Sequence, residues 1–375
     1  MGGLNREAFR KPENYWLAHG TEVFAPILIR GRRWLARGGP QPPTEWKGAL
    51  LLGADHIGDI LYRTVGLELL AAAFPECEFI FAASAPAASL LEGNPHVSLL
   101  KTTKSIERQS LREITREIRR AQVDTVICYD TGAYTKPVIA TALAGVPNCV
   151  AYTYKGLSGL VTQPVPIRRP QPFAVYFRDM VEGLTGRKIA SSRPHVVLRE
   201  EERRRAAEIR ASYGTAPLVV ASVTSRQLSH LAIQRQMIEA LVELKRRANV
   251  TVAILGAAED EALARQLAVE GGLDCQFATG VMSVREAVAF FELAVVAFCL
   301  DSGPRHMANA AGTRVVFVRN LEFLKAEAGC YLPTEIDVAP NEELISYSSH
   351  VTPPLFPVDR AVKAILGSLS AAGMG

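Results

Sequence analysis

One stretch in the second half of the chain combines the residue types of a phosphate-binding turn. The apolar run 294–300 is followed by Asp301, Ser302 and Gly303, and then by a small-residue segment up to Gly312. A buried strand that turns into a helix there leaves free backbone N–H groups at a positive helix end, which suits a phosphate. The same residues also fit an ordinary turn in which Asp301 or Ser302 caps the helix.

A second turn of this kind follows the apolar residues 49–52. Gly53 and Gly58 stand five apart, as in a P-loop, but Asp59 and Ile60 occupy the positions where that motif has lysine and serine or threonine. No Gly-x-Gly-x-x-Gly follows an expected strand, which argues against a dinucleotide-binding dehydrogenase. Two such turns predict two α/β lobes, with the Asp59 carboxylate at the ligand edge of the first.

Four stretches, taken in order from about Ala49 to Asn320, carry a resemblance to a known family. They are IGDIL at 57–61, followed by Thr64 and Leu67; ASVTSR at 221–226; GAAED at 256–260 with TGVMSVRE at 279–286; and DSGPRH at 301–306. Together they resemble the ADP-heptose:lipopolysaccharide heptosyltransferases, glycosyltransferase family 9. The resemblance implies a GT-B architecture, with two Rossmann-like lobes whose parallel sheets face each other across a cleft.

Some positions depart from the family pattern. Arg226 replaces the phosphate-binding lysine, Leu228-Ser229 replaces the tryptophan-proline that follows it, and Val65 replaces a proline. Val318-Arg319-Asn320 stands where an aromatic-glycine pair is expected. Two alternatives therefore stay open: a GT-B transferase that uses a different nucleotide sugar, and a catalytically idle protein that binds nucleotide sugars or acts as a scaffold.

The resemblance implies an inverting, metal-independent glycosyltransferase that moves heptose from ADP-heptose to a lipopolysaccharide-type or other envelope glycan. The nucleotide sugar is a substrate, and no cofactor is expected. Such a transfer needs a base that takes the acceptor proton and dipoles that hold the leaving diphosphate. Asp59 is the candidate base; the alternative is that it caps a helix beginning at Ile60.

The first group of predicted donor-site residues would bind the diphosphate. Ser302 and Gly303 would offer N–H groups, with help from Ser222 and from Arg226. A guanidinium supplies a fork of donors in place of the point charge of lysine. The alternative for Arg226 is a surface salt bridge.

The remaining donor candidates concern the nucleoside and the sugar. Asp260 would accept hydrogen bonds from the ribose hydroxyls, and Met282 would pack on the base or simply fill the core. Asp301 would orient the donor sugar or cap the turn. His306 would contact the substrate or be a buried, hydrogen-bonded helix residue.

The predicted acceptor site groups Gly58 and Thr64, beside Asp59, with two arginines of a proline-rich loop. Arg168 and Arg169 lie between Pro164 and Pro172, where they could meet an anionic acceptor. Exposed loop arginines are also commonly just solvated.

Composition fits this interpretation. A chain of 375 residues that is 48% apolar can fill two domains. Its six cysteines form no C-x-x-C pair and its seven histidines show no metal-ligand spacing, which predicts a reducing compartment, no disulfides and no catalytic metal. The apolar stretch 287–300 is too short to span a bilayer and contains Glu292, and no signal peptide precedes the first lobe. We expect a cytoplasmic protein, with the inner face of the cytoplasmic membrane as a candidate site.

Strand-like and helix-like segments alternate, which predicts parallel sheets covered on both faces. Expected strands are 50–53, 78–82, 125–129 and 148–152, then 218–223, 250–255, 294–300 and 314–318; a helix is expected over 105–120. The predicted parts are an N-terminal extension (1–48), an acceptor-side lobe (49–190), a linker (191–214), a nucleotide-sugar lobe (215–350) and a C-terminal helix that crosses back onto the first lobe (351–375).

The extension carries the net charge of the whole chain. Residues 1–48 hold eight Lys or Arg against four Glu, an excess of +4, which equals the total. Trp16, Phe24, Ile27 and Trp34 alternate with clustered arginines, a pattern that suits peripheral contact with an anionic membrane, where each basic residue adds about 1 kcal/mol. The alternative is that the apolar residues pack on the body. Nucleic acid is not an expected partner, because no second basic patch or base-stacking motif accompanies this segment.

Overall fold

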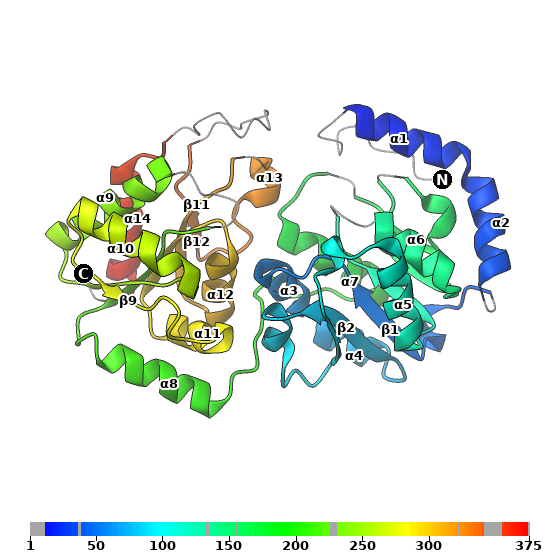
Figure 1. Cartoon of the computed structure of the whole chain (residues 1–375), viewed down its shortest axis with the longest axis horizontal. Coiled ribbons are helices and arrows are strands. Elements are labelled where there is room, and N and C mark those ends of the chain that lie inside the picture. Colours follow the sequence, from blue (N-terminus) through cyan, green and yellow to red (C-terminus); the bar gives the residue numbers. More distant parts are fainter. Residues whose placement is uncertain are drawn as a thin grey trace. The chain divides into compact units, whose positions relative to one another are not determined.

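The computed structural model describes residues 12–36, 39–131, 135–154, 156–167, 169–225, 231–321, 323–340 and 355–373. The chain forms two compact units, Met1–Ser192 and Arg193–Gly375. Each contains one six-stranded sheet whose paired strands are parallel (Figure 1). The predicted α/β class with two Rossmann-like lobes is confirmed.

The sheet of the first unit has the order β3-β2-β1-β4-β5-β6. Its central strand β1 is buried on both faces, as expected of a parallel strand with a continuous apolar sequence. In register, Leu50 of β1 lies between Ile80 of β2 and Val126 of β4. The strands are β1 (Gly48–Leu52), β2 (Glu78–Ser84), β3 (Ser98–Thr102), β4 (Thr125–Cys128), β5 (Asn148–Tyr152) and β6 (Gln163–Val165). The helices that follow the extension are α3 (Ile57–Thr64), α4 (Leu67–Ala73), α5 (Leu111–Ala121), α6 (Thr135–Ala144) and α7 (Phe173–Thr185).

Helix α5 starts later than predicted because of its cap. Ser110 Oγ accepts from the Glu113 amide at 3.3 Å, and the Glu113 carboxylate accepts from the Ser110 amide at 2.7 Å. This capping box satisfies two N–H groups that a helix start leaves unpaired. Residues 106–108 form a separate 3₁₀ turn, so the helix predicted over 105–120 was wrong in its first turn.

The sheet of the second unit has the order β12-β11-β10-β7-β8-β9. Its strands are β7 (Leu218–Ser222), β8 (Thr251–Ile254), β9 (Gln276–Phe277), β10 (Val296–Leu300), β11 (Arg314–Val318) and β12 (Glu335–Asp337). Its helices are α8 (Glu200–Ala211), α9 (Leu231–Arg247), α10 (Glu261–Gly271), α11 (Val284–Glu292), α12 (Gly303–Ala311), α13 (Lys325–Ala328) and α14 (Val358–Ala371).

The ends of this unit differ from the predicted parts. Helix α8, expected in a linker, packs on α11 through the buried pair of Glu202 and Arg285, whose Nε donates at 2.5 Å. Helix α14, predicted to cross back onto the first lobe, contributes one face to the second unit. Its residues Val362 and Ile365 are fully buried in the core of the second unit, beside α9 and β10.

The N-terminal extension forms α1 (Pro12–Val23) and α2 (Ala25–Leu35), drawn in blue in Figure 1. Helix α2 packs beside α6 and the turn Ser158–Leu160. Among the described residues, no helix is both long and apolar enough to cross a membrane.

Gly53, which follows β1, offers a test of how tightly the first turn is packed. A Cβ there would lie 2.6 Å from Tyr129 Cε2, and the Tyr129 ring is itself packed against Phe81 and Phe177. We expect Gly53→Ala to lower the free energy of unfolding by about 1–3 kcal/mol, the usual cost of overpacking. Urea denaturation measures it.

The matched control is Gly183→Ala in α7, where a Cβ would meet nothing within 4 Å. It should be neutral or stabilising by up to about 1 kcal/mol. Equal stability of the two variants would show that the Tyr129 ring does not constrain the turn.

Candidate active site

Asp59 lies in the first turn of α3, at the carboxyl edge of the first sheet. The chain leaves β1 at Leu52, turns through Gly53 and reaches His56, which occupies the N-cap position in an extended conformation. The helix begins at Ile57, so the alternative that Asp59 caps a helix from Ile60 was wrong. Its carboxylate instead lies near the positive helix end.

Arg63 fixes this carboxylate from one turn further along α3. Its Nη1 donates to Asp59 Oδ1 at 3.2 Å and to the Asp59 carbonyl at 3.0 Å. Arg63 is itself held by the Tyr129 ring, 4.7 Å below its guanidinium, and only 5% of its side chain is exposed. Asp59 keeps 26% of its side chain exposed. The pair is therefore anchored on the arginine side and accessible on the carboxylate side.

Burial around Asp59 changes its acidity. Desolvation raises the pKa of Asp59 to about 6, because a partly dry site disfavours the charged form. The Arg63 charge opposes this rise and the nearby Asp130 adds to it. At neutral pH the carboxylate is ionised, yet it binds a proton more readily than an ordinary aspartate, which is what a general base requires.

The surrounding turn is held by other polar contacts. Asp55 Oδ2 accepts from the Ser84 amide at 2.6 Å and from its hydroxyl at 2.5 Å. Asp130 Oδ2 accepts from the Ala54 amide at 3.1 Å. His56 Nε2 lies 3.1 Å from Glu107 Oε2, and this contact raises the pKa of His56.

The predicted acceptor residues are placed as follows. Gly58 precedes Asp59 in α3. Thr64 is 6% exposed and its hydroxyl donates to the Leu61 carbonyl within the helix at 2.7 Å. Arg169 is exposed in the loop after β6, at the same sheet edge but three strands from β1. Arg168 lies outside the described residues.

In the second unit, β10 turns into α12 through Asp301 and Ser302. Ser302 is the N-cap residue, in an extended conformation, and its carbonyl accepts from the Arg305 amide at 3.0 Å. Within the described part of the chain, nothing accepts a hydrogen bond from the amides of Ser302 and Gly303. Both N–H groups are thus available at a positive helix end.

Asp301 is not the cap. Its Oδ1 accepts from Arg305 Nη1 at 2.8 Å and its Oδ2 from the Asn320 amide at 3.4 Å. Burial raises the pKa of this carboxyl, and Arg305 counteracts the rise. That Asp301 also orients a donor sugar stays a prediction.

Sequence reasoning missed what Arg305 does. Its guanidinium is 2% exposed and forms two bonds with Glu335, at 2.6 and 3.1 Å. It also donates to the carbonyls of Ala328 and Gly329 and lies 3.6 Å from the Phe317 ring centre. The spacing of four from Asp301 to Arg305 was a visible signal, whereas Glu335 comes from a distant strand and left none.

His306 lies in the same network. It is 3% exposed, and its Nδ1 is 3.1 Å from the Tyr331 hydroxyl, which also accepts from Asn309. Burial and the Arg305 charge lower the pKa of His306, so the ring is neutral at physiological pH. This matches the buried, hydrogen-bonded alternative; direct contact with a donor stays a prediction.

The loops after β8 and β9 lie against each other at this edge. The Gly280 amide donates to the Gly256 carbonyl at 3.1 Å, and a Cβ on Gly280, whose φ is +67°, would meet Ala258. Asp260 Oδ2 accepts from the Ala257 amide at 2.9 Å. Met282, half-buried, follows Gly280 in the second loop.

Three neighbouring strands thus bring the donor candidates to one edge. The sheet order places β10, β7 and β8 side by side. Ser222, 1% exposed, ends β7 in register with Cys299 of β10, while Asp260 follows β8 and Ser302 follows β10. Arg226 lies outside the described residues.

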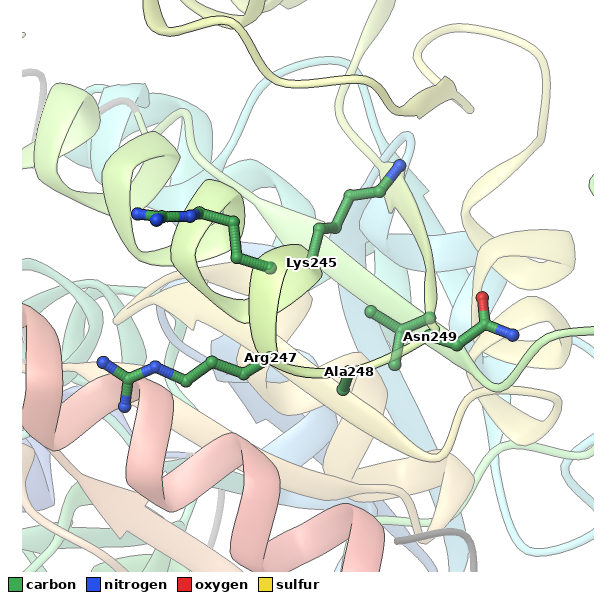
Figure 2. A pocket seen from close by; sticks show the side chains of 6 residues that line it. Lys245, Arg247, Ala248 and Asn249 are labelled. Atoms are coloured by element: carbon green, nitrogen blue, oxygen red, sulfur yellow. The ribbon is translucent and has the colours of Figure 1, made fainter.

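A surface pocket of about 330 Å³ lies elsewhere in this unit (Figure 2). It forms where α9 ends and β8 begins, at the amino edge of the sheet, so it is not the candidate site. Its charges are paired: Lys245 with Asp274 at 2.7 Å, and Arg247 with Glu243 at 2.6 Å. It is lined by Lys245, Arg246, Arg247, Ala248, Asn249 and Val250.

The predicted absence of a catalytic metal stays a prediction. Among the residues that the structure describes, no three His, Cys, Asp or Glu side chains are grouped so as to hold a metal ion.

Comparison with known proteins assigns the chain to a family. The sequence profile of glycosyltransferase family 9 (heptosyltransferase) matches residues 111–318, more than half of the chain. The chain belongs to this family. It is thus a heptosyltransferase-like glycosyltransferase, and the resemblance seen in its motifs is confirmed. No curated protein matches the sequence.

Solved structures of family 9 proteins share the fold. A family 9 glycosyltransferase from Veillonella parvula is 17% identical with a TM-score of 0.73, covering 89% of this chain and 100% of its own. ADP-heptose lps heptosyltransferase II of E. coli is 15% identical with a TM-score of 0.64, covering 87% and 99%. Heptosyltransferase WaaC of E. coli with ADP is 14% identical with a TM-score of 0.61, covering 86% and 99%.

The Asp59–Arg63 pair can be tested in this family 9 protein without substrate. We expect the Asp59 carboxyl to titrate near pH 6, followed by carboxyl-carbon NMR with Asp59→Asn for assignment. Because the Arg63 charge stabilises the ionised form, Arg63→Met should move the midpoint upward, while Arg63→Lys should leave it nearer the wild-type value. A midpoint near 4 in the wild type would contradict the burial argument.

Proposed function

We propose that this chain is an inverting, metal-independent glycosyltransferase that moves heptose from ADP-heptose to an acidic, lipopolysaccharide-type glycolipid or another envelope glycan. The observation that carries the proposal is Asp59, a carboxylate with a pKa of about 6, held by Arg63 and open to solvent at the ligand edge of the first sheet. Family membership supports the reaction class.

In the proposed step, the Asp59 carboxylate takes the proton of the acceptor hydroxyl. The acceptor oxygen forms a bond to the anomeric carbon while the bond from that carbon to the diphosphate oxygen breaks. The electron pair leaves with the nucleoside diphosphate. Attack opposite the leaving group inverts the anomeric configuration.

The second unit is proposed to hold the donor. The amides of Ser302 and Gly303 would stabilise the negative charge that develops on the diphosphate, together with Ser222 and the guanidinium of Arg226. Asp260 would accept from the ribose, Met282 would face the base, and Asp301 and His306 would line the sugar side. In E. coli, solved WaaC structures are described with ADP and with ADP-2-deoxy-2-fluoro heptose.

The second candidate function is transfer of a sugar from a different nucleotide sugar, and the residues at the end of β11 favour this alternative. Arg319 stands where the family has an aromatic-glycine pair. It is 1% exposed, and its Nε donates to Asp337 at 2.9 Å. Its neighbour Asn320 donates its amide to Asp301. Arg319 and Asn320 thus replace the family's aromatic-glycine pair beside Asp301, the residue proposed to line the sugar side, and this replacement would alter which sugar fits.

Replacing the base tests the reaction. Asp59→Asn keeps the shape of the side chain but cannot take the proton, so turnover should fall by about 100-fold or more while ADP affinity stays within a factor of two. ADP release from ADP-heptose with acceptor measures turnover, and calorimetry measures affinity.

Asp274→Asn, at a 92% exposed position, is the control and should retain full turnover. Unchanged turnover of Asp59→Asn would remove Asp59 from its role. Binding without turnover in the wild type, across a panel of nucleotide sugars and acceptors, would favour the idle alternative.

Arg226→Ala tests the donor site. Loss of a charge-assisted phosphate contact should weaken ADP binding by about 2 kcal/mol, roughly 30-fold, in a calorimetric titration. Arg235→Ala, which removes an exposed partner of Glu270, should leave ADP affinity unchanged. If the two variants bind ADP equally well, Arg226 is only a surface residue.

A further inference from the structure

The exposed apolar side chains of this protein are concentrated at one place. Of the 13 large hydrophobic residues exposed in the described parts of the chain, six lie between Trp16 and Leu35. Trp34 is 85% exposed, Trp16 65%, Ile27 64% and Phe24 58%. Single exposed apolar residues are common, but a cluster of large ones marks an interaction site.

Helical geometry explains which side chains of α2 are covered. Leu28 packs on the core of the first unit, and Arg32, one turn later, is 8% exposed with Nη1 donating to the Pro147 carbonyl at 3.3 Å. Ile27 and Trp34, seven residues apart, share another face of the helix, and Phe24, the N-cap residue, lies three residues before Ile27. We call these three residues the outer stripe.

Two exposed arginines of α2 accompany the outer stripe. Arg30 and Arg33 are exposed, whereas Arg32 is not. The outer stripe therefore combines an indole, a phenyl and an aliphatic group with two exposed cationic side chains, on a helix whose other side packs on the first unit. Large apolar groups rimmed by arginine suit the headgroup region of an anionic bilayer.

We propose that the outer stripe docks α2 flat on the surface of an anionic lipid bilayer. The charges favour lipid over a second copy of the chain, because α2 carries three arginines and no carboxylate, so two α2 helices facing each other would meet with like charges and no acidic partner of their own. The inference goes beyond the proposed transfer reaction: it rests on this surface alone and requires no turnover.

The tryptophans provide a built-in probe. Trp16 and Trp34 are both exposed, while Trp46 is 1% exposed and packs against Phe74. In a Trp16→Phe variant, vesicles of phosphatidylglycerol and phosphatidylcholine with brominated acyl chains should quench one of the two remaining emissions, that of Trp34. Trp46 should stay unquenched and serve as the internal reference.

Cosedimentation with the same vesicles, unbrominated, tests the residues. The double variant Ile27→Glu/Trp34→Glu should bind at least tenfold more weakly, and Arg30→Gln/Arg33→Gln should lose much of its salt dependence. Val269→Glu, at an 81% exposed position of α10, is the matched control and should bind like the wild type. Vesicles of phosphatidylcholine alone should bind less.

The proposal is overturned if wild-type protein ignores anionic vesicles at low salt, or if Val269→Glu loses as much binding as the double variant. It is also overturned if light scattering shows a dimer that Ile27→Glu/Trp34→Glu dissociates, since a second copy then covers the stripe. ADP calorimetry on the same variants is a separate readout: failure of nucleotide binding would contradict the transfer proposal and leave vesicle binding standing.

Discussion

The pairing of an aspartate with an arginine four residues later is the interaction on which both ligand edges depend. In the first unit, Asp59 pairs with Arg63, and in the second, Asp301 pairs with Arg305. Each arginine is buried and lies over an aromatic ring. Each guanidinium also donates outside its own helix: Arg63 Nη2 to the Tyr129 carbonyl at 3.4 Å, and Arg305 Nε to Glu335 at 2.6 Å. These contacts tie each helix to the residues of a neighbouring strand or of the turn after it.

The two pairs differ in what remains available. Asp301 is 11% exposed and each of its oxygens accepts a hydrogen bond from the protein, while Glu335 supplies Arg305 with a second carboxylate. Asp59 is 26% exposed and shares its arginine with no second ion-pair partner among the described residues. The same spacing therefore yields a carboxylate saturated by protein contacts in one unit and a more exposed carboxylate in the other.

How much of the fold the sequence alone could predict differs from element to element. Central strands such as β1 and β10 were predictable because continuous apolar runs are typical of strands buried on both faces. Edge strands β3, β6, β9 and β12 were missed, since they are only partly buried and three of them have no more than three residues. The apolar spacing of α14 correctly indicated a buried face but could not say which sheet it would cover.

Prediction of the candidate site from sequence motifs was limited in the same way. Motifs could locate Asp59 and the Ser302 turn because the relevant residues are adjacent in sequence. They could not show that His56 takes the cap position, which leaves Asp59 inside the helix with its carboxylate beside Arg63. Nor could they show Glu335, because its contact with Arg305 spans 30 residues and two strands. The acidity of Asp59 is likewise a property of the folded turn: burial, Arg63 and Asp130 act on it together, and none of the three can be weighed before the chain has folded.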